Sequence, residues 1–566
     1  MEITAAIRNS LRKALELKKS GKLAEAESLL RQLLEKQPDL VEARHHLGNT
    51  LVAGGRLKEG LRELRRAFRE TPDNPILAYN LGLAFYLNLD YTQALKVFSR
   101  AVQLDPEMAD GWINLGLAHH ASGQFKEALA AYDRALKLAP EEPEAHWNQA
   151  LTLLTMGRYR EGFAAYEWRW RRNLKTRTYP HSYSQPRWRG ESFSGKRLLV
   201  FSEQGFGDCL QFARFLPEAR KAGGKIIFEV RPELMRLLQG LPGCDYLVPF
   251  SFSTPCREGF DLQLPLLSLP RVLGTEISRL PPPIHFPALA ASESSPEKKA
   301  ADRLRIGICR AGAPTHVNDH NRSLPGKYLS PLFSGLEQKI SFFNLGKGAQ
   351  NKTRGKNEAG ITGLEDPTTN WRDFYDAALF IRGLDLVISV DTAIAHLAAC
   401  LDRPVWLLLP FVPDWRWQRG TETSPWYPGI KIFRQPAPGD WATVIAQVRH
   451  QLEIHTASIL SLQTVRRHEE GEFEHTATLA RQPKFTAGQS RPHNPAPGPF
   501  WYELGRALHK RKKLDAAAGC YHRALELMPD ETAVLCAIGD LERDRNNLEQ
   551  AANYYRRAGY TIDEQL

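Results

Sequence analysis

Two short segments carry the side chains best suited to chemistry, and the first of them is Phe201–Leu210. Its residues Gly205, Gly207 and Asp208 follow an apolar run and precede a pattern typical of a helix. A turn between a strand and a helix is therefore expected. A carboxylate at the edge of a cleft can accept the proton that a hydroxyl group loses as it attacks. Asp208, at the mouth of this turn, is the candidate catalytic base.

The second segment, Ile388–Leu397, holds Asp391, Thr392 and Ala393. Asp391 follows an expected strand and is expected to cap the helix that comes next. Thr392 and Ala393 would then lie in the first helical turn, where free N–H groups and the helix dipole favour a phosphate group. Arg322 could supply a positive charge to the same phosphates. A cleft between the two segments would bring a base and a diphosphate site together.

Each of these residues also has a structural explanation. Asp391 could serve only as an N-cap, a contribution of roughly 1 kcal/mol. Arg322 could simply pair with Asp319, and His396 suits a buried position on an apolar helix as well as a ligand contact. Asp208 is preferred because a carboxylate in a glycine-rich turn has little structural reason to be there.

The glycine turn allows a second chemical interpretation. Gly205 and Gly207 could begin a dinucleotide-binding fingerprint, with Glu229 at the end of the next strand as the ribose acceptor. Leu210 stands where the third glycine is needed, and Asp208 would meet the pyrophosphate. Redox chemistry with a dinucleotide is therefore disfavoured.

The overall composition is less informative. With 566 residues, the chain is expected to contain three or four domains. Its formal net charge of +11 comes from scattered Lys and Arg, which favours an ordinary basic surface over a nucleic-acid site. The seven cysteines include no C-x-x-C pair, so reduced thiols and no metal site are expected. No signal peptide and no apolar run of about 20 residues is recognisable, which predicts a cytoplasmic protein without a transmembrane segment.

A period of 34 residues marks the first part of the chain. Prolines recur at positions 38, 72, 106 and 140, and small and aromatic residues such as Gly82 and Phe98 recur in phase between them. These units resemble tetratricopeptide repeats, with an incomplete copy before them and a degenerate copy after them. The unit returns near the C-terminus with Gly505 and Tyr521. Such repeats stack into a superhelix with a concave face, which we expect to hold a protein or peptide partner.

From residue 197 the pattern changes to alternating strands and helices. The first set has strands at 197–201, 225–230, 246–249 and 261–264 and helices at 210–222 and 232–241. The second set has strands at 304–309, 340–345, 385–390 and 405–409 and helices near 374–383 and from 393. Each set resembles a Rossmann-like half-domain. Two such halves joined by a linker describe a GT-B-type architecture, with a ligand cleft between the halves.

The expected fold class is therefore multidomain, α plus α/β. It combines a tetratricopeptide α-solenoid, a GT-B-type pair of Rossmann-like domains and a short C-terminal tetratricopeptide segment. The expected boundaries are 1–176 for the first repeats, 177–290 and 303–454 for the two halves, 455–497 for a flexible linker and 498–566 for the last repeats.

The segment Trp168–Lys196 interrupts the 34-residue period and is rich in Trp and Arg. Aromatic side chains interleaved with arginines can bind single-stranded nucleic acid. The preferred interpretation is structural: a last helix docks on the next domain, and Trp188 anchors an extended linker. No nucleic-acid partner is expected.

Five segments carry a further resemblance. They are Glu203–Phe212 (EQGFGDCLQF), Thr315–Leu324 (THVNDHNRSL), Ser389–Ala398 (SVDTAIAHLA), Trp406–Trp417 and Ser424–Pro428. Together they resemble glycosyltransferase family 9, the heptosyltransferase-like group, and within it the bacterial subset fused to tetratricopeptide repeats. The resemblance covers roughly Trp188 to Leu452.

The sequence holds no acidic cluster that implies a metal, so a metal-independent reaction is expected. The resemblance implies an inverting glycosyltransferase with a nucleotide-sugar co-substrate and no other cofactor. It implies Asp208 as the general base. The implied substrate and nucleotide contacts are Gln204, Gly205, Gly207, Arg322, Ser323, Lys347, Asp391, Thr392, Ala393 and His396. The sequence departs from the family at Cys209, at Cys309–Arg310 and at Gly346, which lie near the expected donor pocket and leave the donor open.

Two functions remain in competition. The first is transfer of a sugar from a nucleotide-sugar to a protein or glycan acceptor that the repeats recruit. The alternative is a non-catalytic tetratricopeptide scaffold for protein–protein interaction, in which the GT-B domain is a relic.

Overall fold

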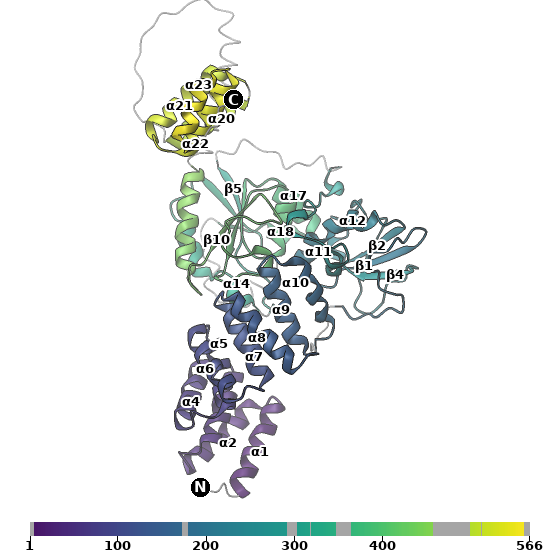
Figure 1. Cartoon of the computed structure of the whole chain (residues 1–566), viewed down its shortest axis with the longest axis vertical. Coiled ribbons are helices and arrows are strands. Elements are labelled where there is room, and N and C mark those ends of the chain that lie inside the picture. The colour runs from purple at the N-terminus through teal and green to yellow at the C-terminus, as the bar shows by residue number, and fades with distance from the viewer. Residues whose placement is uncertain are drawn as a thin grey trace, which may run out of the picture. The chain divides into compact units, whose positions relative to one another are not determined.

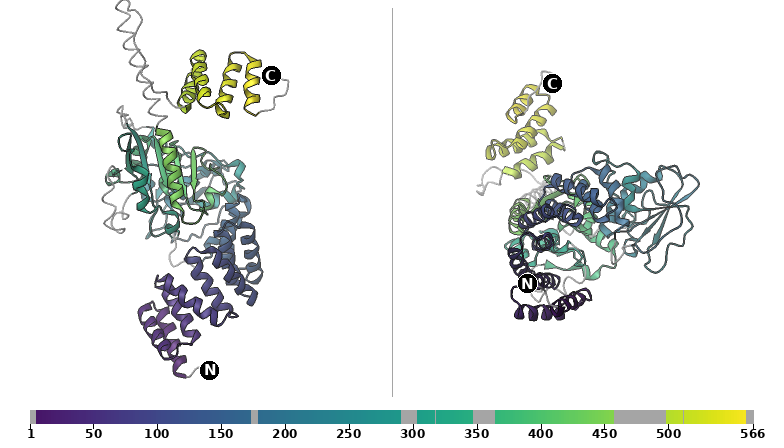
Figure 2. Two further views of the ribbon diagram at one scale, coloured as in Figure 1. Left: turned by 90° about the vertical axis from the view of Figure 1, so that its left-hand side faces the viewer. Right: turned by 60° about the horizontal axis from the view of Figure 1, so that its bottom comes forward.

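The structure is a computed structural model of the chain (Figures 1 and 2). It describes residues 5–172, 179–290, 303–316, 318–346, 364–456, 498–510 and 512–559. Lys347 and almost all of the linker predicted at 455–497 lie outside these residues. The chain divides into two compact units. The first comprises Met1–Lys298, Arg305–Tyr328 and Phe342–Val444, and the second comprises Lys299–Leu304, Leu329–Ser341 and Ile445–Leu566.

Helices alone form the first part of the chain (Figure 1). They are α1 (Ala5–Lys19), α2 (Leu23–Lys36), α3 (Val41–Ala53), α4 (Leu57–Glu70), α5 (Pro75–Leu87), α6 (Tyr91–Leu104), α7 (Ala109–Ala121), α8 (Phe125–Leu138), α9 (Pro143–Thr155) and α10 (Tyr159–Tyr166). Each periodic proline follows the end of α2, α4, α6 or α8 by two residues, where a helix cannot continue. A methyl group on Gly82 would come within 2.6 Å of the Phe98 ring, so the period reflects close helix crossing.

Four further helices occur in the second unit. They are α20 (Gly498–Lys510), α21 (Leu514–Leu527), α22 (Thr532–Asp544) and α23 (Leu548–Arg557). α20 packs against α21, and α22 packs against α23. A small core that includes Tyr521 and Ile538 joins the two pairs.

The first half of the α/β region is a four-stranded parallel sheet in the order β3-β2-β1-β4. Its strands are β1 (Arg197–Phe201), β2 (Lys225–Val230), β3 (Tyr246–Pro249) and β4 (Leu262–Pro265). The helix predicted at 210–222 starts four residues earlier, as α11 (Phe206–Phe212), and continues through a 3-10 turn into α12 (Leu216–Arg220). No α-helix forms within 232–241, where a 3-10 turn, Pro232–Leu234, and further turns bury the leucines instead.

The second half is a six-stranded sheet in the order β10-β9-β8-β5-β6-β7. Its strands are β5 (Leu304–Cys309), β6 (Ile340–Asn344), β7 (Leu364–Glu365), β8 (Leu386–Val390), β9 (Val405–Leu409) and β10 (Ile430–Arg434). Its helices include α14 (Asp319–Arg322), α15 (Leu329–Phe333), α17 (Phe374–Arg382) and α18 (Ala393–Cys400). Sequence patterns did not predict the short strands β7 and β10.

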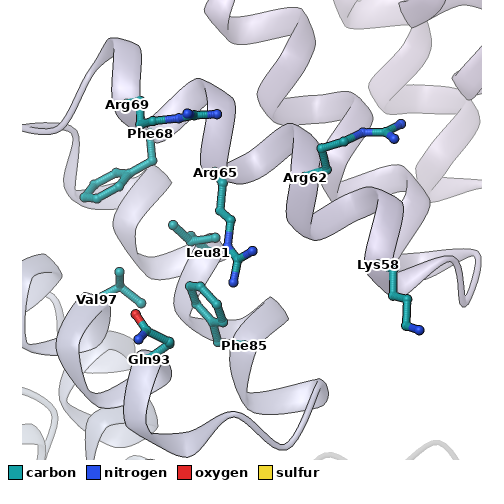
Figure 3. A pocket seen from close by; sticks show the side chains of 9 residues that line it. All are labelled: Lys58, Arg62, Arg65, Phe68, Arg69, Leu81, Phe85, Gln93 and Val97. Atoms are coloured by element: carbon teal, nitrogen blue, oxygen red, sulfur yellow. The ribbon is translucent and has the colours of Figure 1, made fainter.

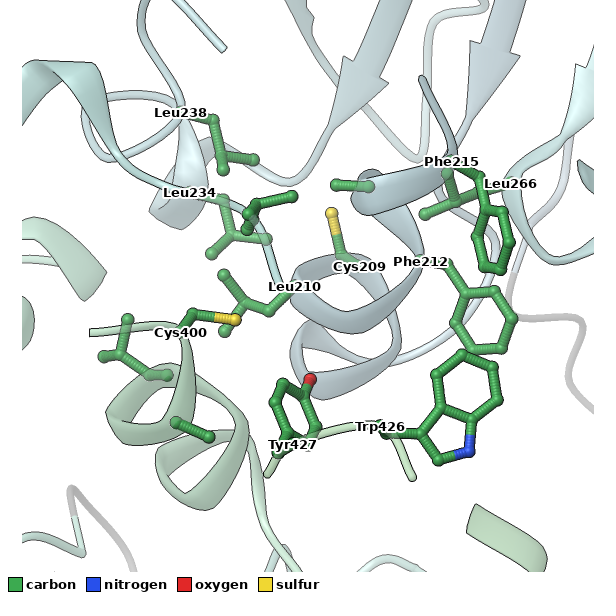
Figure 4. Packing of buried hydrophobic residues seen from close by; sticks show 14 of the residues in the cluster. Cys209, Leu210, Phe212, Phe215, Leu234, Leu238, Leu266, Cys400, Trp426 and Tyr427 are labelled. Carbon is green, nitrogen blue, oxygen red and sulfur yellow. The ribbon is translucent and has the colours of Figure 1, made fainter. Parts of the chain in front are cut away.

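An aromatic junction joins the last helical repeat to both halves. Tyr159 on α10 accepts a hydrogen bond of 2.8 Å from the indole N–H of Trp426 in the second half. The Trp426 ring lies 5.7 Å from that of Phe212 on α11 in the first half. Figure 4 shows Phe212, Phe215 and Trp426 close to one another. The last repeat and the two halves therefore share one buried core.

The aromatic and basic segment that follows α10 contacts its own chain. Trp168 stacks on His146 with ring centroids 3.7 Å apart, and Arg172 pairs with Glu144 at 2.8 Å. Trp188 is fully buried against the first half. This segment docks the repeats onto the sheet, as the structural interpretation predicted. Among the helices of the described residues, none combines the length and apolar character needed to cross a bilayer.

Candidate functional site

The strand order of the second sheet reverses between β5 and β8. From β5 the chain runs outward through β6 and β7, and then it returns to the other side of β5 to form β8, β9 and β10. Parallel α/β sheets bind ligands beyond the carboxyl ends of the strands at such a reversal. Arg322 in the loop after β5 and Asp391 directly after β8 meet there. The guanidinium Nη1 of Arg322 donates to the carbonyl oxygen of Asp391 at 3.2 Å.

Arg322 and Ser323 have different roles in this loop. Nε of Arg322 lies 3.8 Å from the Asp319 carboxylate, so the expected pairing exists at long range. The guanidinium rests against Gly312, where a methyl group would collide with it. The buried Ser323 hydroxyl donates to Asp319 at 2.6 Å and accepts the Gly312 N–H at 3.2 Å. Ser323 therefore shapes the loop, and Arg322 is the residue whose charge reaches the strand ends.

The start of α18 differs from the prediction. Thr392 is the N-cap residue, so the expectation that Asp391 caps the helix is wrong. The Thr392 hydroxyl lies 3.1 Å from the Ser389 hydroxyl and donates to the Cys309 sulfur at 3.5 Å. No side chain caps α18, and Ala393 is its first residue. The first-turn N–H groups are thus not taken by a cap, as a phosphate site requires.

The acidity of the Asp391 carboxylate is strongly perturbed. Burial raises its pKa to about 6, and the nearby charge of Asp414 acts in the same direction. Arg416 and Arg322 oppose this effect. The Nε2 atom of His396 lies 3.9 Å from the carboxylate. A carboxylate with a pKa this close to neutrality can exchange a proton at physiological pH.

His396 occupies a buried position on α18. Its Nδ1 atom shares a hydrogen bond of 3.0 Å with the Tyr427 hydroxyl. Burial, with smaller contributions from Arg416 and Arg214, holds the pKa of His396 well below its usual value. The imidazole is neutral and packs between the halves.

Asp208 is held by two interactions that sequence reasoning did not anticipate. It lies in the first turn of α11, where its carboxylate accepts the Gly205 N–H at 2.9 Å. Its other oxygen accepts a hydrogen bond from the buried Arg416 guanidinium. Arg416 also donates to Asp414 at 2.8 Å and to Gln211 at 2.6 Å. The premise that Asp208 has little structural reason to be in this turn is therefore wrong.

The helices that carry the two predicted segments pack against each other. A methyl group on Gly207 of α11 would come within 2.8 Å of the His396 ring and 3.4 Å of the Ala393 backbone on α18. The absence of a side chain at Gly207 thus lets α11 and α18 approach. We call the surroundings of this contact the α11–α18 junction, comprising Asp208, Arg322, Asp391, Thr392 and Arg416. Gln204 and Gly205 lie in the adjoining turn, where Gln204 is partly exposed and Gly205 is exposed.

The first sheet also has an order reversal, between β1 and β4, but the chain itself occupies it. Nη2 of Arg169, from the segment after α10, donates to Glu203 after β1 and to Ser268 after β4, each at 2.8 Å. Arg169 also pairs with Glu167 at 2.8 Å. Burial raises the pKa of Glu203, and the charge of Arg169 opposes that effect. The reversal of the second sheet is thus the better place for a ligand.

Sequence reasoning missed Asp414, Arg416 and His316. Asp414 and Arg416 belong to the stretch Trp406–Trp417, which the sequence interpretation used only for the family resemblance. His316 lies in the segment before Arg322. Burial is the main cause that lowers the pKa of His316, and the charge of Arg322 lowers it further. The charges of Asp208 and Asp414 also reach His316, which places it near the junction. The alternation of charged and aromatic residues after β9 was the sequence pattern that could have identified Asp414 and Arg416. Over the described ranges, no cluster of three or more His, Cys, Asp or Glu side chains is arranged to hold a metal ion.

The helical repeats match a known repeat family. Sequence models of the tetratricopeptide repeat match residues 11–75, 45–109, 79–143 and 113–168, and a further model matches residues 498–531. These segments are tetratricopeptide repeats. The α-helical pairs at both ends of the α/β region thus belong to a class of repeat that builds protein-interaction scaffolds.

One curated relative spans more than the repeats. Protein FlbA of Caulobacter vibrioides (strain ATCC 19089 / CIP 103742 / CB 15) is 25% identical over 304 residues, which cover 48% of this chain and 49% of FlbA. The chain thus matches about half the length of this relative.

Solved structures of other tetratricopeptide proteins match short parts of the chain. MamA of MSR-1 is 28% identical, with a TM-score of 0.26, over 28% of this chain and 91% of its own. PilF of Pseudomonas aeruginosa is 22% identical, with a TM-score of 0.28, over 30% of this chain and 77% of its own. YrrB, described as having an unusual peptide-binding site, is 21% identical with a TM-score of 0.26, over 28% of this chain and 82% of its own.

Proposed function

We propose that the chain is a glycosyltransferase of GT-B-type architecture. It would transfer a sugar from a nucleotide-sugar to a protein or glycan acceptor that the tetratricopeptide repeats recruit. The observation that carries the proposal is the α11–α18 junction. Asp208 of the first half lies on α11, which packs against α18 of the second half. Thr392 begins α18, and Arg322 donates to the carbonyl oxygen of Asp391 beside it. A two-substrate transfer needs a base and a leaving-group site held in this way.

The proposed reaction is a single displacement. The acceptor hydroxyl gives its proton to Asp208, and its oxygen forms a bond to the anomeric carbon. The bond from that carbon to the nucleoside diphosphate breaks on the opposite side, so the configuration inverts. Arg416 orients the Asp208 carboxylate, and the acceptor hydroxyl would compete with Arg416 for one carboxylate oxygen.

The donor side of the proposal rests on the second sheet. Arg322 and the uncapped N-terminus of α18 would hold the diphosphate and stabilise the negative charge that develops as it leaves. The N–H of Ala393 belongs to the first turn of α18. The neutral His396 side chain, on the same helix, is fixed by its hydrogen bond with Tyr427. The proposal invokes no metal and no cofactor besides the nucleotide-sugar. Lys347 remains a predicted nucleotide contact outside the described residues.

A ligand screen tests the donor site. Melting temperatures of the full chain are measured with UDP, GDP, ADP, CDP and their common sugar conjugates. At least one nucleotide should stabilise the protein, and Thr392→Trp, which blocks the start of α18, should abolish the shift. Asp208→Asn should retain the shift and lose turnover, since the base acts in transfer rather than in nucleotide binding. Turnover that survives Asp208→Asn would remove Asp208 from the mechanism.

A non-catalytic scaffold is the second candidate, and one observation favours it. The ion pair between Asp208 and Arg416 gives the carboxylate a structural role that needs no substrate. In that case no nucleotide stabilises the protein, and Asp208→Asn lowers the melting temperature without any change in ligand response. The screen therefore separates the two functions.

A further inference from the structure

A groove on the first repeats lies apart from the α11–α18 junction. It has a volume of about 690 Å³ and runs between α4 and α6, with α5 as its floor (Figure 3). Its lining is Lys58, Arg62, Arg65, Phe68, Arg69, Leu81, Phe85, Gln93 and Val97. The second helices of two adjacent repeats thus form its walls.

The α4 wall of this groove is strongly basic. Lys58, Arg62, Arg65 and Arg69 recur at intervals of four, three and four residues, which places them on one face of the helix. The lining includes no acidic residue. Within the described chain, Lys58, Arg65 and Arg69 form no ion pair, and Arg62 approaches only Glu63, at 3.4 Å.

The floor of the groove is apolar. Leu81 and Phe85 are buried, whereas Phe68 and Val97 keep part of their surface open. The guanidinium of Arg65 lies over the Phe85 ring, 4.8 Å from its centroid. In Figure 3 the Arg65 side chain reaches from α4 across the opening toward Phe85. An occupant would therefore meet cations at the rim and apolar surface below.

We propose that this groove binds an acidic polypeptide segment of a partner protein. Carboxylates of the segment would pair with Arg62, Arg65 and Arg69, and an apolar side chain would enter against Val97 and Phe68. A channel between two helices fits an extended or helical peptide. A single-stranded nucleic acid would need open aromatic faces for its bases, and Arg65 already covers Phe85. The interaction is independent of the proposed sugar transfer.

The test uses the full chain and fluorescence anisotropy. The probe is a fluorescein-labelled dodecapeptide with the repeating sequence glutamate–glutamate–leucine. Its lysine–lysine–leucine counterpart and a twelve-nucleotide oligothymidylate serve as comparison probes. The acidic peptide should bind, the basic peptide should not, and affinity should fall as salt rises from 50 to 500 mM.

Variants locate the binding. Arg65→Glu combined with Arg69→Glu should weaken binding of the acidic peptide about tenfold or more, because two attractions become repulsions. Arg66→Glu is the matched control, since Arg66 lies on the same helix outside the groove lining and pairs loosely with Glu70 at 3.8 Å. It should change affinity less than about twofold. Circular dichroism verifies that each variant folds.

Three results would overturn the proposal. The acidic peptide fails to bind, or it binds the double variant as tightly as the Arg66→Glu control. In the third, the oligothymidylate binds more tightly than the acidic peptide and loses affinity in the double variant, which would assign the groove to nucleic acid.

Discussion

The ionised Asp391 carboxylate is expected to destabilise the folded protein at neutral pH. Its side chain is only 16% exposed. Burial, followed by the charge of Asp414, raises its pKa to about 6, against an unfolded value of about 3.9. The folded protein therefore binds this proton more tightly than the unfolded chain does. Stability falls as pH rises through the window between about 4 and 6, and the cost is fully present above it.

The size of the effect follows from the pKa difference. About two pH units correspond to a free energy on the order of 3 kcal/mol, which Asp391→Asn would recover at neutral pH while keeping the side-chain shape. For a unit of this size the melting temperature at pH 7.5 should rise by about 3 °C. Below pH 4 the variant and the natural protein should melt together.

Thermal melts at intervals between about pH 2 and pH 8 measure this difference. Asp376→Asn is a control of opposite sign, because a hydrogen bond from Arg372 and, more weakly, Arg236 hold the pKa of Asp376 below its usual value. Its removal should lower the melting temperature at neutral pH, and that loss should fade as the pH falls below 4. The reasoning is refuted if Asp391→Asn melts at or below the natural temperature at pH 7.5. A gain of equal size at pH 4 and pH 7.5 would show that ionisation is not its cause.

Three other substitutions test the packing around the site. Arg169→Met leaves the Glu203 carboxylate buried without its cation, and it should lower the free energy of unfolding by about 3–5 kcal/mol in denaturant titrations. Adding Glu203→Gln should restore much of that loss. Additive losses in the double variant would contradict this explanation. Gly207→Ala pushes α11 from His396 and should reduce any nucleotide-induced thermal shift at least several-fold, and an unchanged shift would separate the junction from binding. Gly82→Ala should destabilise the first repeats by about 1–3 kcal/mol, measured by circular dichroism, and a neutral effect would mean that the neighbouring helix moves freely.

Periodic patterns allowed much of the fold to be predicted. The prolines of the 34-residue repeat fall just after helix ends, because proline stops a helix whatever surrounds it. Most of the buried strands were predictable from continuous apolar runs, as in β8 and β9. The helix at 206–212 was misplaced, because its start depends on the hydrogen bond between Asp208 and the Gly205 N–H.

The candidate site was only partly predictable. Asp391 and Thr392 were predicted from a strand followed directly by a helix start, and the structure places Arg322 beside them. Arg416 was missed, since its partner Asp208 lies 208 positions away in sequence and no local pattern joins them. The N-cap was assigned one residue too early, because the backbone stays extended through Thr392 before α18 begins.

The sequence by itself determined the repeats, the alternation of strands and helices, and the aspartate-bearing turns after β1 and β8, since each depends on neighbours within a few residues. Only the tertiary structure decided which reversal of strand order the segment after α10 occupies. It placed Arg169 in the first sheet's reversal and left Arg322 beside the start of α18 in the second. It also paired Asp208 with Arg416. These contacts join distant segments, and burial and charge pairing between such segments exist only once the chain has folded.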